Sequence, residues 1–252
     1  RKTRTVRILL HAASVLALSA LCTACEETAA PDMKLLSSHG LYSDMATRKP
    51  VPTALEYEPD YPLWSDAVQK RRWIILPQGA RIDTSDMDHW QFPVGTKLFK
   101  EFAQHGQLLE TRLVERIASS GKVDKDYKLA TFVWREEQDD AVETKDGAQD
   151  VLGTDHNVPA QKLCLDCHRG EPGRVLGVSA LQLSRSGLLE TLAKRARLSV
   201  DPKRTYEIPG DEVAAAAAGY MHANCGHCHS DAGQAPSSLH MRLSVNELDN
   251  PL

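Results

Sequence analysis

Alternating apolar and polar residues predict β-strands in the first half of the chain. The strand-like stretches are residues 71–76, 90–102, 109–117 and 127–134. In residues 109–117 apolar side chains alternate with charged ones, which is the period of a strand with one buried face. Residues 127–134 are rich in aromatic and β-branched types, which favour strands. Because no amphipathic helix interrupts these stretches, we expect an antiparallel sandwich or a partial barrel.

Two interruptions and four tryptophans refine this prediction. Pro93 and Gly95 break residues 90–102, so this stretch is two strands or one strand with a bulge. The tryptophans of the region are Trp64, Trp73, Trp90 and Trp134. A sugar-binding platform is one use for such residues, but large aromatic side chains in strands pack in a core more often. We therefore expect these tryptophans in the core.

The pattern becomes helical in the second half. Residues 136–155 are acidic and contain glycines, which indicates a connecting loop or hairpin. Residues 178–198 carry apolar side chains at helical spacing, with basic residues in the last turn. Asp211 is a good N-cap for a second helix, which runs through an alanine-rich stretch to Cys225.

These patterns together predict an α+β protein. We expect an antiparallel β-sandwich-like domain at residues 63–155, followed by a mainly helical region at residues 156–252. Residues 25–62 contain five prolines and no sustained period, which indicates a tether and a lead-in to the β-rich domain.

The N-terminus has the composition of an export signal. Residues 1–7 hold four basic side chains and residues 8–24 are mostly apolar, as in a secretory signal peptide. A permanent membrane helix is the alternative, but 17 residues that include His11 are marginal for spanning a bilayer. Cys25 follows in a context that resembles a bacterial lipoprotein processing site; an ordinary cleavage site nearby is the other interpretation. We expect export to the periplasm or cell envelope, with a lipid anchor at Cys25 in the first case.

The charge of the chain limits its partners. The net charge is −4, and it becomes −8 without residues 1–24, which hold four basic and no acidic side chains. No basic run follows the N-terminus, so we expect no nucleic-acid partner.

Two copies of a Cys-x-x-Cys-His motif carry the chemistry. They are CLDCH at residues 164–168 and CGHCH at residues 225–229, and they use every cysteine beyond Cys25. This is the attachment pattern of c-type haem, in which two thiols add to the porphyrin vinyl groups and the histidine becomes an axial iron ligand. The predicted attachment residues are Cys164, Cys167, Cys225 and Cys228. The predicted proximal iron ligands are His168 and His229.

Other uses of the four cysteines fit the spacing less well. A structural zinc site uses paired cysteines, but the 57 residues between Cys167 and Cys225 exceed a compact zinc loop, and zinc gives no reason for the repeated histidine. A disulfide within such a pair is more often a redox motif than a structural link. A thioredoxin-like role needs a βαβ context, which neither motif has.

Several stretches together resemble a family of exported bacterial dihaem c-type cytochromes. They are YEPDYPLW at residues 57–64, RRWIILP at 71–77, WQFPVGT at 90–96, LLETRLV at 108–114, the first motif with VLG at 175–177, and YMHANC at 220–225. The resemblance covers most of residues 57–230, and the haem motifs are its specific portion. It implies an N-terminal β-rich part, a C-terminal cytochrome c-like dihaem region with two c-type haems, and electron transfer with redox partner proteins.

The resemblance leaves other functions open. A dihaem peroxidase-type enzyme, with one iron open to substrate, is the main alternative to a carrier. A ligand-binding β-domain with attached haems is the third. Members of the family usually continue well past the second motif, so we expect this chain to lack a C-terminal segment of the family.

The distal ligand of the first haem has three candidates. The chain holds no methionine between Met87 and Met221, so a sulfur ligand close in sequence to His168 is absent. The candidates are His156, which lies twelve residues before His168, and the neighbours Met221 and His222 on the second predicted helix. Helix geometry points those neighbours in different directions. We expect a closed electron-transfer centre with one of the three as its second ligand.

Overall fold

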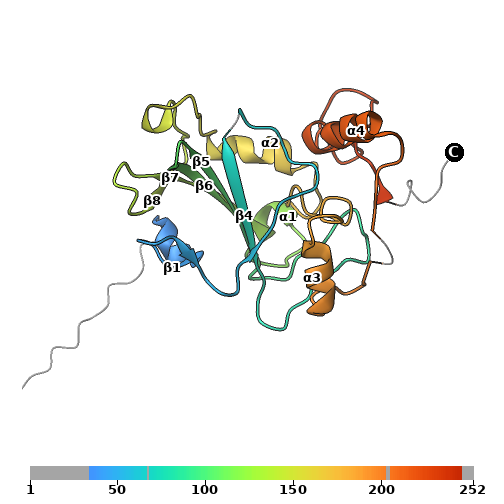
Figure 1. Ribbon diagram of the computed structural model, residues 1–252, viewed down its shortest axis with the longest axis horizontal. Helices are drawn as coiled ribbons and strands as arrows, with labels where there is room; N and C mark the ends of the chain where they lie inside the picture. The colour runs from blue at the N-terminus through green and yellow to red at the C-terminus, as the bar shows by residue number, and fades with distance from the viewer. Residues whose placement is uncertain (1–33, 67, 203–204, 246–252) are drawn as a thin grey trace, which may run out of the picture. The chain divides into compact units, whose positions relative to one another are not determined.

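A six-stranded antiparallel sheet is the central element of the protein (Figure 1). The structure is a computed structural model that describes residues 34–66, 68–202 and 205–245. Each strand pairs with the next one along the chain, as in a meander. The strands are β3 (Leu55–Glu56), β4 (Gln69–Ile75), β5 (Lys97–Gln104), β6 (Gln107–Arg116), β7 (Tyr127–Trp134) and β8 (Ala141–Glu143). The predicted antiparallel, β-rich region is therefore confirmed.

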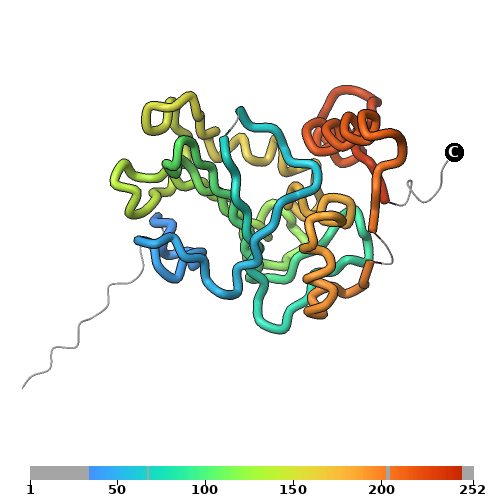
Figure 2. Tube along the Cα trace, in the orientation of Figure 1, coloured from blue at the N-terminus to red at the C-terminus, as the bar shows by residue number. Residues whose placement is uncertain are grey.

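Shorter elements accompany this sheet. A second sheet pairs the two strands β1 (Tyr42–Asp44) and β2 (Lys49–Pro50). The helical elements are η1 (Leu36–His39), α1 (Val123–Asp126), η2 (Val151–Gly153), η3 (Gln161–Leu163), α2 (Cys164–His168), α3 (Leu188–Lys194) and α4 (Glu212–Asn224). Figure 2 follows the path from the green strands through the yellow segment of the first motif to the red segment of the second.

The four predicted strand stretches correspond to β4, β5, β6 and β7, with one change, whereas β1, β2, β3 and β8 lie outside those stretches. In residues 90–102 only the part from Lys97 onward is a strand. The Pro93 carbonyl accepts a hydrogen bond from the Thr96 amide at 3.1 Å, and Gly95 has a φ of 91°. This turn ends the extended backbone before β5 because proline donates no hydrogen bond and few other residues adopt such a φ.

Three of the four tryptophans lie in the core, as expected. Trp73, Trp90 and Trp134 are each 1% exposed, whereas Trp64 is 62% exposed. Trp64 precedes β4 in the lead-in, and its backbone amide donates to Asn224 Oδ1 at 2.7 Å. The core prediction is therefore wrong for Trp64, because proximity in sequence to the strands does not place a lead-in residue on a sheet face.

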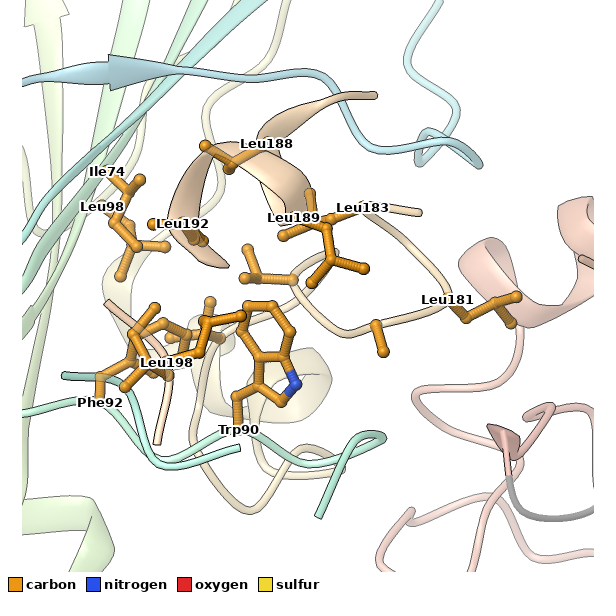
Figure 3. Close-up of a cluster of buried hydrophobic side chains, with 14 of the residues drawn as sticks. Ile74, Trp90, Phe92, Leu98, Leu181, Leu183, Leu188, Leu189, Leu192 and Leu198 are labelled. Carbon is orange, nitrogen blue, oxygen red and sulfur yellow. The ribbon is translucent and has the colours of Figure 1, made fainter. Parts of the chain in front are cut away.

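The large sheet carries clusters of buried hydrophobic residues on both of its faces. Successive strand residues point to opposite faces, so the neighbours Trp73 and Ile74 belong to different clusters. On the Trp73 face, sheet residues pack against the N-terminal Leu36 and Leu41. On the Ile74 face, the core includes residues that follow the first Cys-x-x-Cys-His motif, and Figure 3 shows Leu192 of α3 in this cluster. The β-rich part and the motif region thus share one core within the compact unit Asp32–Leu252.

Of the two predicted helices of the second half, one is helical over only part of its predicted range and the other is present as predicted. In residues 178–198 only α3 is helical, and Gly187, with a φ of 76°, precedes it. Leu181 and Leu183 are buried without being helical, so the apolar stripe packs on the sheet largely as irregular chain. The helix that leads to Cys225 is confirmed as α4, and its N-cap Asp211 accepts the Ala214 amide at 2.8 Å.

Hydrogen bonds and ion pairs attach the segment after the second motif to the loop before β5. The Asp88 carboxylate accepts the amide of Val245 at 2.8 Å and the hydroxyl of Ser244 at 2.7 Å. Glu171, which follows the first motif, pairs with Arg242 at 2.5 Å and with His89 at 2.9 Å. These contacts hold segments from both motifs against the β-rich part.

The predicted export signal at residues 1–24 and Cys25 lie outside the described residues. Within residues 34–245, apart from the gaps at 67 and 203–204, we find no helix with the length and apolar character needed to cross a membrane.

Candidate functional site

The first Cys-x-x-Cys-His motif is folded as a single helical turn. η3 leads directly into α2, which consists of the motif itself. Helical spacing places residues three and four apart on one side, so Cys164, Cys167 and His168 share a face. Both cysteines are free thiols; Cys164 is half-buried and Cys167 is exposed. Burial raises the pKa of each thiol, so both are protonated at neutral pH.

The ring of His168 is held in one tautomer. Its Nδ1 lies 2.7 Å from the backbone carbonyl oxygen of Arg174. Because a carbonyl oxygen only accepts, Nδ1 carries the proton and donates, which leaves the lone pair on Nε2. Burial, opposed by this hydrogen bond, lowers the pKa of His168 to about 4. The imidazole is therefore neutral at pH 7 and presents the nitrogen that a metal needs.

A cavity of about 400 Å³ is lined by the first motif and by the sheet. Cys164, Cys167 and His168 all contribute to its wall. Apolar side chains form much of the remaining lining: Leu98, Val114, Pro159, Leu163, Val175 and Val178. The size is within the usual range for sites that bind small molecules and cofactors.

Three basic side chains of the sheet also line the cavity. Arg72 on β4 pairs in register with Lys100 on β5, and Lys100 pairs with Arg112 on β6. Directly opposite residues on neighbouring antiparallel strands share a face, so the three form a row, which we call the basic row. Burial, reinforced by the charges of Arg72 and Arg112, holds the pKa of Lys100 well below its ordinary value.

The second motif follows α4 without a break. Cys225 is the C-cap of this helix, and its carbonyl accepts the amides of Cys228 at 3.0 Å and His229 at 2.9 Å. His229 Nδ1 lies 3.3 Å from the carbonyl oxygen of Leu239, so Nδ1 again donates and Nε2 keeps its lone pair. Cys225, Cys228 and His229 are not among the residues that line the cavity of the first motif.

The two motifs pack against each other. Gly170, just after the first motif, approaches the backbone of His227 so closely that a Cβ at Gly170 would overlap the His227 carbonyl oxygen. Burial raises the pKa of the Cys167 thiol, and the charge of Cys228 in the second motif raises it further. His227 itself lines the cavity, and its buried Nδ1 has no hydrogen-bond partner in the described part of the chain.

The three distal candidates lie in different surroundings. The Nε2–H group of His156 donates to Glu110 Oε2 at 2.8 Å, and His156 does not line the cavity. Met221 is 42% exposed and does not line the cavity either. His222 is 8% exposed and lines it, together with His168. Of the three, only His222 is placed to act in the same space as the first motif.

The ring of His222 has the opposite tautomer to that of His168. The backbone amide of Leu243 donates to His222 Nδ1 at 3.0 Å, so Nδ1 is an acceptor. In the neutral ring the proton is then on Nε2. Burial lowers the pKa of His222 to about 4, so the ring is neutral at pH 7. His222 in this arrangement offers an N–H group, and coordination through Nε2 would require that proton to move.

The residues at the first motif fit a c-type haem. Two thiols and a neutral imidazole with a free Nε2 share one wall of a largely apolar cavity, as covalent attachment and axial ligation require. In residues 34–245, leaving out the gaps, we find no cluster of three or more His, Cys, Asp or Glu side chains arranged to hold a metal ion by themselves. A haem needs only one or two protein ligands, so the two observations agree.

The sequence patterns do not reveal the basic row or the role of the Arg174 carbonyl. A signal for the row is present in β5, where Lys100 lies between Leu98 and Phe102 on the same face of an alternating strand. A charged residue at such a position either faces solvent at a sheet edge or serves a buried site. The pairing of Lys100 with Arg72 and Arg112 depends on strand register, which the alternation alone does not give.

Comparisons of the chain with protein-family models, with curated proteins and with solved structures find no match.

Proposed function

We propose that this chain is an exported dihaem c-type cytochrome that transfers electrons between redox partner proteins. In this proposal residues 156–252 form a mainly helical, cytochrome c-like region next to the β-rich part. Cys164 and Cys167 attach one haem and Cys225 and Cys228 attach the other. The sequence resemblance to exported dihaem cytochromes supports the same assignment.

The observation that carries the proposal is the convergence at the first motif. Cys164, Cys167 and His168 line one cavity, and the carbonyl of Arg174 fixes the His168 tautomer with Nε2 free. A disulfide has no need for this tautomer at a histidine next to the second cysteine. An axial haem ligand does.

A bound haem supplies a one-electron iron couple, whose potential depends on axial ligands, burial and hydrogen bonds to those ligands. The protein's part is to hold and orient the ligand. The Arg174 carbonyl keeps the His168 ring in place, and the hydrogen bond makes Nε2 a stronger donor. The apolar walls restrict water, and the contact between Gly170 and His227 keeps the two motifs close together.

Export remains part of the proposal because c-type haem is attached outside the cytoplasm. The support is the basic and then apolar composition of residues 1–24. Lipidation at Cys25 would anchor the protein to a membrane surface without a spanning helix. Replacement of Cys25 by alanine should then release the protein or block its processing.

Haem stoichiometry tests the proposal. Produced in a host with cytochrome c maturation, the protein should carry two haems that survive acid-acetone extraction. The double variant Cys164→Ser/Cys167→Ser should retain one haem, and Cys225→Ser/Cys228→Ser should also retain one. Protein that carries no covalent haem under these conditions, or that contains zinc in its place, would overturn the proposal.

One observation favours a second candidate, a dihaem peroxidase-type enzyme. The hydrogen bond from Leu243 leaves the proton of His222 on Nε2, so His222 is a hydrogen-bond donor in the cavity unless that bond is replaced. A first haem without a second protein ligand would be open to a small substrate on that side. Carbon monoxide distinguishes the candidates, because it binds an open ferrous haem and leaves a six-coordinate low-spin carrier unchanged.

A further inference from the structure

We infer that the basic row of Arg72, Lys100 and Arg112 binds the two propionate carboxylates of the haem attached at the first motif. This inference rests on the proposed function, since it needs a haem at Cys164 and Cys167. It assigns three sheet residues, far from the motif in sequence, to the same cofactor.

The position of the row suits this role. The vinyl groups and the propionates lie toward opposite edges of a haem, so the thiols and the carboxylate partners must come from different walls of the site. The thiols are on α2, whereas the basic row is on β4, β5 and β6, and both line one cavity.

The carboxylates near the basic row form few ion pairs with it. The guanidinium group of Arg112 pairs with the buried carboxylate of Glu110. Its Nε donates to Oε1, and its Nη2 donates to Oε2 at 3.0 Å. The carboxylate of Glu171, which lines the cavity, pairs with Arg242 at 2.5 Å and with His89 at 2.9 Å. Among the described residues, no carboxylate forms an ion pair with Arg72 or Lys100.

The carboxylates of Asp166 and Glu58 are weaker partners for the basic row. Asp166 also lines the cavity, but it is an exposed residue of α2. The charge of Glu58 acts on Arg72 without an ion pair, and Glu58 is exposed. Two basic groups of the row therefore lack a close anionic partner, which matches the two carboxylates of one haem.

The arrangement is unfavourable unless an anion is present. Like charges directly opposite on neighbouring strands destabilise a sheet, and the row contains two such pairs. Arg72 is 5% exposed, and burying a charge without a partner is costly. Among the described residues, the ammonium group of Lys100 lies against the ring of Phe102, at 4.7 Å from the ring centroid, and the charge of Glu110, which is already paired with Arg112, acts on Lys100 without an ion pair. Guanidinium and ammonium groups bind carboxylates well, so two carboxylates would turn the repulsion into attraction.

The test compares the haem-loaded and haem-free forms of Lys100→Met. In the haem-free protein, made without cytochrome c maturation, this substitution removes repulsion, so the urea midpoint of unfolding should rise. In the loaded protein it removes a carboxylate partner, so the midpoint should fall. The midpoint potential of the first haem should also fall, because a positive charge near the iron favours the reduced state. Lys125→Met, at an exposed residue of α1, is the matched control and should change neither form.

Two further variants keep the result decisive. Lys100→Arg keeps the positive charge, so the loaded variant should have the same midpoint of unfolding as the unsubstituted protein. If Lys100→Met fails to fold, Arg72→Met should show the same opposite shifts in the haem-free and loaded forms. The assignment of the row would be overturned if the urea midpoint of unfolding shifted in the same direction in the haem-free and haem-loaded proteins. It would also be overturned if the midpoint did not shift in a protein that carries both haems. Absence of covalent haem in the unsubstituted protein would instead overturn the proposed function, so the two failures are distinguishable.

Discussion

The backbone of His227, inside the second Cys-x-x-Cys-His motif, lies directly against Gly170, just after the first motif. The contact leaves no room for a side chain at Gly170, since a Cβ there would overlap the His227 carbonyl oxygen. The φ of Gly170 is not in the left-handed range, so the requirement for glycine comes from this approach and not from backbone strain. The contact ties the two proposed haem sites together.

Gly170→Ala should therefore separate the motifs. We expect a loss of about 2 kcal/mol in the free energy of unfolding, as for overpacking in a dense region, and slower electron exchange between the haems. Urea unfolding and stopped-flow reduction would measure these changes. Gly106→Ala is the control: its φ is 80°, but open space surrounds it, so it should leave the haem kinetics unchanged. Unaltered unfolding and kinetics in Gly170→Ala would show that the motifs are not packed in this way.

Alanine variants of the three distal candidates should not be equivalent. His156→Ala and Met221→Ala should leave the spectra of the first haem unchanged, because His156 is bound to Glu110 and Met221 is exposed. Only His222→Ala should alter them, since His222 lines the cavity. Low-temperature electron paramagnetic resonance and carbon monoxide binding are the measurements.

The kind of change at His222 separates the two candidate functions. Conversion of the first haem from low-spin to high-spin would identify His222 as an iron ligand and support a closed carrier. An unchanged spin state with altered carbon monoxide binding would identify it as a hydrogen-bond donor over an open haem. An effect of His156→Ala or Met221→Ala as large as that of His222→Ala would contradict the placement of all three.

Local patterns predicted the elements that carry their own signals. Residues 127–134 alternate and are rich in strand-forming types, and β7 has the same bounds. Asp211 has the side chain of an N-cap and is the cap of α4. In both cases the interactions that form the element lie within or next to it in sequence, so periodicity and capping rules are sufficient.

The missed features depend on distant partners. The apolar stripe of residues 178–198 matched a helical period, but Leu181 and Leu183 satisfy it by packing on the sheet as irregular chain. The basic row exists only when the register of three strands brings Arg72, Lys100 and Arg112 together. Tertiary packing decides such features, and a single sequence contains no local record of it.

Removal of the N-cap should destabilise α4, the helix that leads into the second motif. Asp211→Ala deletes the acceptor for the Ala214 amide, and the loss of such a cap costs about 1 kcal/mol. We expect a lower thermal midpoint and less complete haem attachment at Cys225 and Cys228. Asp211→Asn keeps an acceptor in the same place, so it should resemble the unsubstituted protein. If both variants lose haem equally, the charge of Asp211 matters and its capping bond does not.

Glu110 should make stability depend on pH in the acid range. Its side chain is fully buried and bonded to Arg112 and His156. Burial by itself would raise the pKa of Glu110, but the hydrogen bond with His156 and the charge of Arg112 lower it overall. A carboxyl group with a lowered pKa in the folded state stabilises that state above its unfolded pKa of about 4.3. The contribution is lost as the pH falls through the lower, folded pKa.

Glu110→Gln should cost about 3 kcal/mol at pH 7, because it leaves Arg112 without its buried partner. Between about pH 5 and pH 3, the free energy of unfolding should fall more steeply in the unsubstituted protein than in the variant. Urea unfolding at several pH values would measure both slopes. Glu115→Gln, on the same strand, is the control, since Glu115 is only partly buried and its oxygen lies 3.8 Å from Lys97 Nζ; it should cost less than about 1 kcal/mol. Parallel pH curves for Glu110→Gln and the unsubstituted protein would mean that the Glu110 carboxylate does not stabilise the fold through its charge.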